Sequence, residues 1–449
     1  MIRIDSSGNL RYRAITRANV LRTPQWDDLC TEVREAVEVV STVLPFRTNQ
    51  YIMAELIDWS RVPDDPMFQL TFPQREMLHE DDYAVMASLI RRGAPREVIE
   101  EEANRIRYEL NPHPAGQLTH NVPRLGRKRL SGIQHKYRET VLFFPSHGQT
   151  CHAYCTFCFR WAQFAGLDEL KFATREVDHL VAYLRQNPQV TDMLITGGDP
   201  MVMKSSLLEQ YIEPLLKLDQ LLTIRIGTKA VAYWPHRFVT DPDADDLLYL
   251  FERVMDHGKQ LAIMAHYCHP VELSTDVARE AVRRIRSTGA NIRMQSPVVK
   301  HVNDSADIWA EMWRMGARLG CIPYYMFVNR DTGAQDYFQI PLIRCWNIFQ
   351  GAYRQVSGIA RTVRGPSMSA FPGKVHILGT SNVGGERAFV LQYLQARRPE
   401  LVRRPFFARF DPEATWFDEL RPLTAADRRF FPTIQHRPAS FILGLPEEA

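Results

Sequence analysis

From about residue 138 onward, short apolar runs alternate with segments of helical periodicity. Segment 274–289, for example, opens with Ser-Thr-Asp and closes on Gly, as a capped helix does. Alternating strands and helices predict an α/β domain with a parallel sheet. The runs rich in β-branched and aromatic residues, which we interpret as strands, are 140–146, 192–198, 223–228, 261–267, 291–299 and 322–328.

These strands read as continuous apolar stretches, which predicts a sheet buried on both faces. Six units are too few for an eight-fold barrel, so we expect an open, partial (β/α)6 barrel over residues 131–330. In complete barrels of this kind the site lies at the carboxyl ends of the strands, and we expect the same here.

The two flanking regions differ from this pattern. Residues 1–130 contain helical periodicity, for example over 26–44 and 80–93, followed by a Pro-, Gly- and Arg-rich segment, 111–130, that reads as a linker. Residues 331–449 form the C-terminal region. Its last 75 or so residues show few strand signals, so we expect an extension that wraps around the barrel or pairs with it.

Composition narrows the class of protein. Of 449 residues, 45% are hydrophobic and 24% are charged, as in globular proteins. A net charge of +3 gives no reason to expect nucleic acid or a membrane as partner. No apolar run approaches the roughly 18 residues of a membrane span, and none near the start resembles a secretory signal. The seven cysteines are too few for a disulfide scaffold, so we expect a cytoplasmic protein.

Three cysteines stand together directly after the first strand, in CHAYCTFCFR. Cys151, Cys155 and Cys158 follow the spacing Cys-x3-Cys-x2-Cys, whereas zinc sites usually have two separated Cys-x2-Cys pairs. Only His147 or His152 offers a nearby fourth ligand. Three thiolates on a short loop suit a [4Fe–4S] cluster with one open iron. A zinc knuckle and buried, unreactive thiols are the alternatives.

This spacing resembles the signature of the radical S-adenosylmethionine (SAM) enzymes. In that superfamily SAM chelates the open iron, and its reductive cleavage yields a 5′-deoxyadenosyl radical. The second strand ends in Gly197-Gly198-Asp199, which resembles the superfamily's GGE/GGD motif. The glycines would let the backbone approach the ammonium of SAM, and Asp199 would add a charged acceptor.

The resemblance narrows to the lysine 2,3-aminomutase family, which combines SAM with pyridoxal 5′-phosphate (PLP). It implies that Lys374, which follows a turn ending in Gly373, forms the Schiff base with PLP. It also implies that Arg160 holds the substrate carboxylate, a task that suits a planar guanidinium. The resemblance extends from about 135 to 376 and rests on HKYRETVLFF, IRIGTKA, HYCHPVEL, QSPVVKHVND, IPYYMFV and FPGKV.

Other positions take roles by the same resemblance. Lys136 stands where the family carries an arginine that contacts the PLP phosphate. Thr140 stands where a second such arginine is usual, so another residue has to supply that charge. His266 and Gln295 match positions near SAM.

Two departures bear on the substrate. Arg330 and Ser367 occupy the positions at which lysine-specific members carry aspartates for the distal ammonium of lysine. An inward-pointing Arg330 would favour aspartate or glutamate as substrate. If Asp331 neutralises Arg330 and turns it away, a small neutral amino acid such as alanine fits better. The C-terminal cysteines that bind zinc in some members are missing, so no zinc is expected.

The resemblance implies an isomerase that moves an amino group from C2 to C3 of an α-amino acid. Another radical reaction at the β-carbon, such as elimination or deamination, is an alternative, as is a non-catalytic descendant that binds the cluster. The expected partners are an amino acid substrate and a reductant such as flavodoxin or ferredoxin, and we expect a homo-oligomer.

Overall fold

A computed structural model describes residues 10–110, 121–165 and 172–432. One sheet runs through it in the order β15-β14-β13-β12-β11-β10-β9-β8-β7-β6-β5. Its parallel part contains all of the predicted strands, which are confirmed as β6 (Thr140–Phe143), β7 (Asp192–Ile195), β8 (Thr223–Thr228), β9 (Gln260–His266), β10 (Asn291–Val298) and β11 (Ile322–Val328). Strand β5 (Ile133–Tyr137) pairs antiparallel with β6.

The C-terminal region extends this sheet. Strand β12 (Arg364–Ser369) adds a seventh parallel strand beside β11, and β13 (Gly373–Val383), β14 (Glu386–Ala396) and β15 (Pro405–Arg409) follow antiparallel. The predicted pairing with the barrel is confirmed, but the expectation of few strands is wrong. The Gly384-Gly385 turn between β13 and β14 has φ values of +60° and +87°, as a tight hairpin requires.

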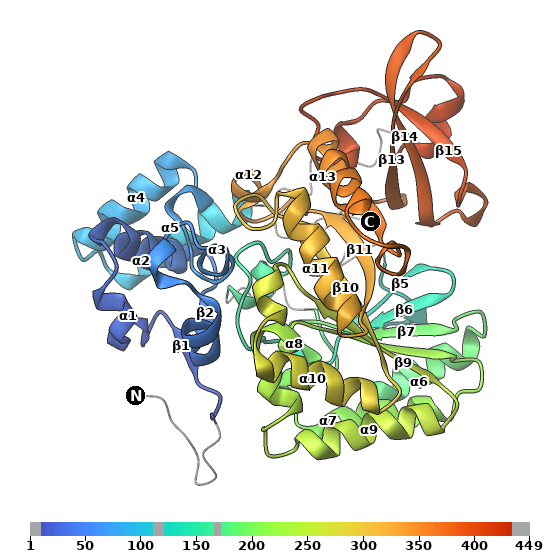
Figure 1. Cartoon of the computed structure of the whole chain (residues 1–449), viewed down its shortest axis with the longest axis horizontal. Helices are drawn as coiled ribbons and strands as arrows, with labels where there is room; N and C mark the ends of the chain where they lie inside the picture. The colour runs from blue at the N-terminus through green and yellow to red at the C-terminus, as the bar shows by residue number, and fades with distance from the viewer. Residues whose placement is uncertain (1–9, 111–120, 166–171, 433–449) are drawn as a thin grey trace.

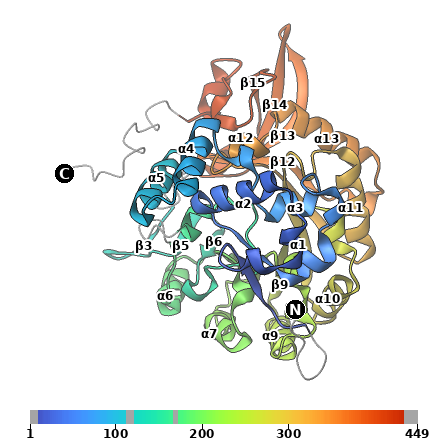
Figure 2. The same ribbon diagram turned by 90° about the vertical axis from the view of Figure 1, so that its left-hand side faces the viewer.

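Helices lie outside the sheet (Figures 1 and 2). The predicted helix over 274–289 is observed as α10 (Asp276–Ser287): the Thr275 side chain accepts a hydrogen bond from the Ala278 N–H, and Gly289 follows the C-terminus at φ +87°. The others on this side are α6 (Val177–Gln186), α7 (Ser205–Leu216), the short α8 (Ala230–Tyr233), α9 (Ala244–Asp256), α11 (Ala306–Arg318), α12 (Gln335–Phe338) and α13 (Leu342–Arg354).

Alternate side chains of the parallel strands meet different surroundings. On β8, Ile224, Ile226 and Thr228 are buried, whereas Arg225 and Gly227 are half-exposed. Strands β7 and β10 alternate in the same way. The prediction of a sheet buried on both faces therefore holds for β9, where positions 261–265 are all buried, and is wrong for β7, β8 and most of β10. On these three strands one face packs in the core, and the inner face carries polar side chains that stay partly accessible. The sequence still looks apolar there, because a short strand has only two or three inner positions.

The N-terminal region lies across the ring of strands and helices (Figure 2). The predicted helices are present as α2 (Thr31–Val43) and α4 (Glu80–Arg91). Of the predicted linker, 111–120 lies outside the described residues, and the rest contains the small hairpin β3–β4. Further elements here are β1 (Ala14–Thr16), α1 (Pro24–Asp27), β2 (Arg47–Asn49), α3 (Pro66–Thr71), α5 (Arg96–Glu109), β3 (Arg124–Leu125) and β4 (Lys128–Arg129).

No helix within the described residues is long and apolar enough to cross a bilayer.

Candidate functional site

The loop after β6 carries three free, half-buried thiols, those of Cys151, Cys155 and Cys158. Burial raises the pKa of each, that of Cys155 to about 12, and the neighbouring thiols raise the pKa of Cys151 further. Thiolates here therefore need a bound cation, as the irons of a cluster provide. Across the described ranges, no three His, Cys, Asp or Glu side chains converge closely enough to hold a single metal ion.

The N-terminal region holds this loop in place. The backbone N–H of Tyr154 donates to the Arg47 carbonyl at 2.8 Å, and that of Thr156 donates to the Leu70 carbonyl at 3.0 Å. The Arg47 guanidinium donates to the Thr150 hydroxyl at 2.7 Å. Because this loop follows a parallel strand, the N-terminal region covers the carboxyl end of the sheet, where the site was expected. No motif in the sequence points to Arg47.

The Gly-Gly-Asp turn after β7 packs against the same loop. A Cβ on Gly198 would lie 2.5 Å from the Thr150 carbonyl oxygen, and one on Gly197, which has φ +152°, would lie 2.3 Å from the Gln149 side chain. The Asp199 N–H donates to the Thr150 carbonyl at 2.7 Å. Gly198 is thus required for the close packing of two backbone segments, and Gly197 for its positive φ beside the Gln149 side chain. The approach of these glycines to SAM, which the resemblance implies, stays a prediction.

The Asp199 carboxylate has a different role from the one expected. One oxygen accepts from the Met201 N–H at 2.9 Å and the Thr228 hydroxyl at 2.7 Å, and the other accepts from the N–H groups of Lys229 and Ala230 at 2.8 and 3.1 Å. These four bonds occupy the lone pairs that a charged ligand would need. Asp199 therefore ties the turn to the end of β8, and its side chain is not a free acceptor.

His266 and Gln295 end up side by side, since they are register partners on the neighbouring strands β9 and β10. Burial lowers the pKa of His266 well below its usual range, with a further contribution from Lys229, so the ring is neutral. Its ring centroid lies 5.8 Å from that of Phe157, between the second and third cysteines. Both residues therefore face the cysteine loop, as expected of groups near SAM.

Arg160 connects the cysteine loop to a second group of polar side chains. Burial lowers its pKa to about 10; Cys158 counteracts this shift, while the nearby charge of Arg330 adds to it. Its guanidinium lies 4.3 Å from the centroid of the Phe144 ring, and its Nη1 is buried without a hydrogen-bond partner. A buried guanidinium with an unused donor suits a carboxylate ligand.

Arg330 follows β11 and lies between two aromatic rings, at 5.7 Å from the centroid of Phe159 and 5.2 Å from that of Trp416. Its Nη1 donates to the Ser369 carbonyl at 3.1 Å, while Nε and Nη2 are buried and unpartnered. Asp331 is near, at 3.5 Å from Nε, but that oxygen has no hydrogen-bond partner either. Arg330 is thus only partly neutralised by Asp331.

Ser367 and Lys374 belong to paired strands. Ser369 is opposite Lys374 and Ser367 is opposite His376 in the β12–β13 register, which puts Ser367 and Lys374 on one face. The Ser367 hydroxyl is fully buried and has no partner. The Lys374 ammonium lies 4.2 Å from the Tyr325 ring centroid, and burial, with the charge of Arg225, lowers its pKa to about 8.

Further cations surround this lysine. Lys136 on β5 donates to the Ala370 carbonyl, at the turn before Lys374, and burial lowers its pKa well below the usual range. Arg225 reaches Lys374 from β8, where it is paired with Asp192. Thr140, at the expected place of a second phosphate arginine, instead donates to that aspartate at 2.8 Å. Arg225 was not identified from the sequence, although it lies within the IRIGTKA stretch.

The structure therefore brings the predicted residues together in two adjoining groups. The first, which we call the thiol half, is built on strand ends and loops after β6, β7, β9 and β10. The second, the cation half, comes from β5, β11, β12 and β13, and Arg160 lies between the two. The thiol half contains Cys151, Cys155, Cys158, Gly197, Gly198, Asp199, His266 and Gln295. The cation half contains Lys136, Arg330, Ser367 and Lys374.

Comparison with known proteins agrees with this arrangement. No family model matches the chain. A protein of Aquifex aeolicus (strain VF5) that bears the provisional name L-lysine 2,3-aminomutase is 30% identical over 400 residues, covering 89% of this chain and 94% of that protein. The L-lysine 2,3-aminomutases of Bacillus subtilis (strain 168) and Clostridium subterminale are 26% and 25% identical over 58% and 60% of this chain. Those matches cover 51% and 62% of the two enzymes.

Among solved structures, a radical SAM methyltransferase from Sphaerobacter thermophilus aligns with a TM-score of 0.35 at 16% identity, over 62% of this chain and 91% of that one. A likeness this weak supports no conclusion. The Aquifex relative, by contrast, matches along nearly its whole length, and the shared region includes both halves of the site. On that basis the chain belongs to the lysine 2,3-aminomutase family.

Proposed function

We propose that this protein is a radical SAM, PLP-dependent 2,3-aminomutase that acts on an acidic α-amino acid. The observation that carries the proposal is the meeting of the two halves at Arg160. This residue follows Cys158 by two positions, and its guanidinium and that of Arg330 lie 5.2 and 5.7 Å from the centroid of the same Phe159 ring. When bound, the [4Fe–4S] cluster and SAM would supply a carbon-centred radical, and PLP would carry the migrating amino group.

The thiol half fits the first pair of cofactors. Cys151, Cys155 and Cys158 would hold three irons, leaving the fourth for SAM. The neutral His266 and the Gln295 amide face the loop from neighbouring strands and offer hydrogen bonds without adding charge. The covering N-terminal region keeps water and stray hydrogen donors away from this loop.

The cation half fits PLP. With a pKa of about 8, a substantial fraction of Lys374 is the neutral amine that attacks an aldehyde. Lys136 and Arg225 lie within electrostatic reach of Lys374. A phosphate bound there would oppose the lowering of the Lys136 pKa that burial causes. Arg225, although paired with Asp192, would stand in for the arginine that Thr140 replaces.

The choice of substrate follows from unused donors. Arg160 would bind the α-carboxylate through its free Nη1, and Arg330 would bind a side-chain carboxylate through Nε and Nη2. Leaving these buried donors unpaired would cost about 1–3 kcal/mol each, so an anionic ligand is favoured. The ammonium of lysine would meet a cation at Arg330 instead of a carboxylate. Glutamate or aspartate is therefore preferred, with alanine next.

Three further expectations remain predictions: flavodoxin or ferredoxin as reductant, a homo-oligomeric state and a cytoplasmic location.

Anaerobic incubation of the reconstituted protein with SAM, PLP, dithionite and single amino acids tests the function. The expected product of glutamate or aspartate has the mass of the substrate and a β-amino group. A product that has lost ammonia would replace the aminomutase with a radical deaminase or lyase. Retention of the cofactors with no turnover of any amino acid would support a non-catalytic cluster-binding protein.

A further inference from the structure

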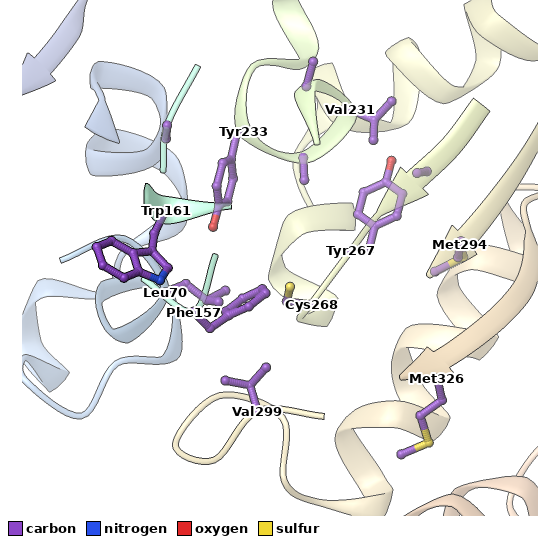
Figure 3. Close-up of a cluster of buried hydrophobic side chains, with 14 of the residues drawn as sticks. Leu70, Phe157, Trp161, Val231, Tyr233, Tyr267, Cys268, Met294, Val299 and Met326 are labelled. Carbon is purple, nitrogen blue, oxygen red and sulfur yellow. The ribbon is translucent and has the colours of Figure 1, made fainter. Parts of the chain in front are cut away.

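Tyr233 stands directly beside the cysteine loop, although no motif in the sequence points to it. It ends α8 and is buried, at 1% exposure. The Cys155 thiol and the Tyr233 hydroxyl form a hydrogen bond of 3.5 Å. In Figure 3 the hydroxyl points toward the side on which Phe157 and Trp161 lie. Within the described residues, no other side chain forms a hydrogen bond with this hydroxyl.

The direction of this bond depends on the state of the cysteine. A free thiol donates to the tyrosine oxygen, as the structure records. A thiolate bound to iron has no proton, so the hydroxyl of Tyr233 must then be the donor. A hydrogen bond to a cluster sulfur withdraws electron density from it and favours the reduced cluster.

A buried ion pair holds the ring of Tyr233 in place. The ammonium of Lys229, which is paired with Glu272, lies 4.3 Å from the centroid of the Tyr233 ring. Lys229 is fixed there by hydrogen bonds to Glu272 at 2.6 Å and to the His266 carbonyl at 3.2 Å. The backbone of Tyr233 is held as well, because the Asn49 side chain donates to the Tyr233 main-chain carbonyl at 2.9 Å.

We infer that Tyr233, positioned by the contact of its ring with Lys229, sets the reduction potential of the cluster by donating a hydrogen bond to the Cys155 thiolate. This inference rests on the proposed function only for the presence of the cluster. Tyr233 lies outside the cysteine motif. Its hydrogen bond makes reduction of the cluster easier than the three thiolates alone would allow.

The test is a redox titration of the cluster in the anaerobic holoprotein, followed by electron paramagnetic resonance, for wild type and Tyr233→Phe. We expect the midpoint of the variant to be more negative, so that the ratio of reduced to oxidised cluster at a fixed potential falls about 3- to 10-fold, as for loss of one hydrogen bond. Tyr211→Phe is the matched control: its hydroxyl is also buried but contacts the His147 ring at 3.0 Å.

Iron content keeps the two proposals apart. A wild type without iron would refute the proposed function, whereas an iron-loaded Tyr233→Phe with the wild-type midpoint would refute only the role of Tyr233. A control that shifts as far as the variant would refute it too. If Tyr233→Phe fails to load iron, resonance Raman spectra of wild type decide: we expect the iron–sulfur stretches to differ between H₂O and D₂O, and identical spectra would overturn the inference.

Discussion

The two halves of the site differ in how far their polar groups are satisfied. In the thiol half, the Asp199 carboxylate accepts four hydrogen bonds from the protein. In the cation half, Arg330 and Ser367 keep buried donors without partners, as does Arg160 between the two halves. Buried polar groups are normally paired. The cysteine loop also keeps unpartnered buried atoms, on Gln149 and His152. The protein itself therefore satisfies the turn at Asp199, whereas Arg160, Arg330 and Ser367 keep donors that an anionic ligand would satisfy.

Loss of a cysteine breaks the thiol half outright. Changing Cys151, Cys155 or Cys158 to Ala should lower the iron content of the anaerobically purified protein from about four per chain to nearly none, because a site-differentiated cluster has only three protein ligands. Iron and sulfide analysis makes the measurement. Cys345→Ala, a buried free cysteine on α13, is the control and should keep its iron. Full iron loading in all three variants would exclude the cluster assignment.

Loss of Lys374 removes the covalent anchor of the cation half. In wild type, borohydride should trap PLP on Lys374. The rate at which added PLP forms the imine should rise with pH around a midpoint of about 8, because burial lowers the pKa of Lys374 to that value and only the neutral amine attacks the aldehyde. Lys374→Ala should lose the label, as peptide mapping by mass spectrometry shows. Exposed Lys217→Ala should keep it. A label on another lysine in wild type would refute the assignment.

These two predictions rest on different kinds of sequence information. The cysteines could be predicted because all three lie close together on the loop after one strand, and the two glycines because they stand together at the end of the next strand. Lys374 could be placed only by resemblance to a family. Phe159 and Trp416 were missed, because they meet Arg330 only after the C-terminal region has folded onto the barrel. A propensity for strands says nothing of such contacts between distant segments.

The parallel strands themselves were predictable from their apolar runs, but not the alternation of their faces. Arg225 and Asp192 lie at inner positions of neighbouring strands and pair with each other. In the sequence each is a single polar residue beside an apolar run, and nothing there shows that the two meet. The seventh parallel strand, β12, contains Gly365, Pro366 and two serines, which are poor strand formers. Its place beside β11 comes from tertiary pairing, which overrides local propensity.

Arg330→Gln sharpens the comparison, because it removes charge from the cation half alone. We expect kcat/KM for glutamate or aspartate to fall about 10- to 150-fold, the equivalent of a charge-assisted hydrogen bond, with little change for alanine. Exposed Arg314→Gln on α11 is the matched control. Equal losses for acidic and neutral substrates would mean that Arg330 supports the fold and does not select the side chain.

Ser367→Ala should have the smallest effect. If the buried hydroxyl completes the substrate site, KM for the acidic substrate should rise about 2- to 10-fold, the equivalent of one neutral hydrogen bond. The free energy of unfolding of the ligand-free protein should be unchanged or higher, because a buried hydroxyl without a partner is removed. A clear loss of stability on denaturant unfolding would show that Ser367 already has a structural role.

The central claim is that the cation half selects an anionic amino acid for radical chemistry at the thiol half. The most direct measurement is competition among glutamate, aspartate, alanine and lysine for deuterium from SAM labelled at the 5′ carbon, with each amino acid analysed by mass. We expect deuterium to enter glutamate or aspartate first and the labelled product to be an isomer of the substrate. Preferential labelling of lysine would contradict the claim.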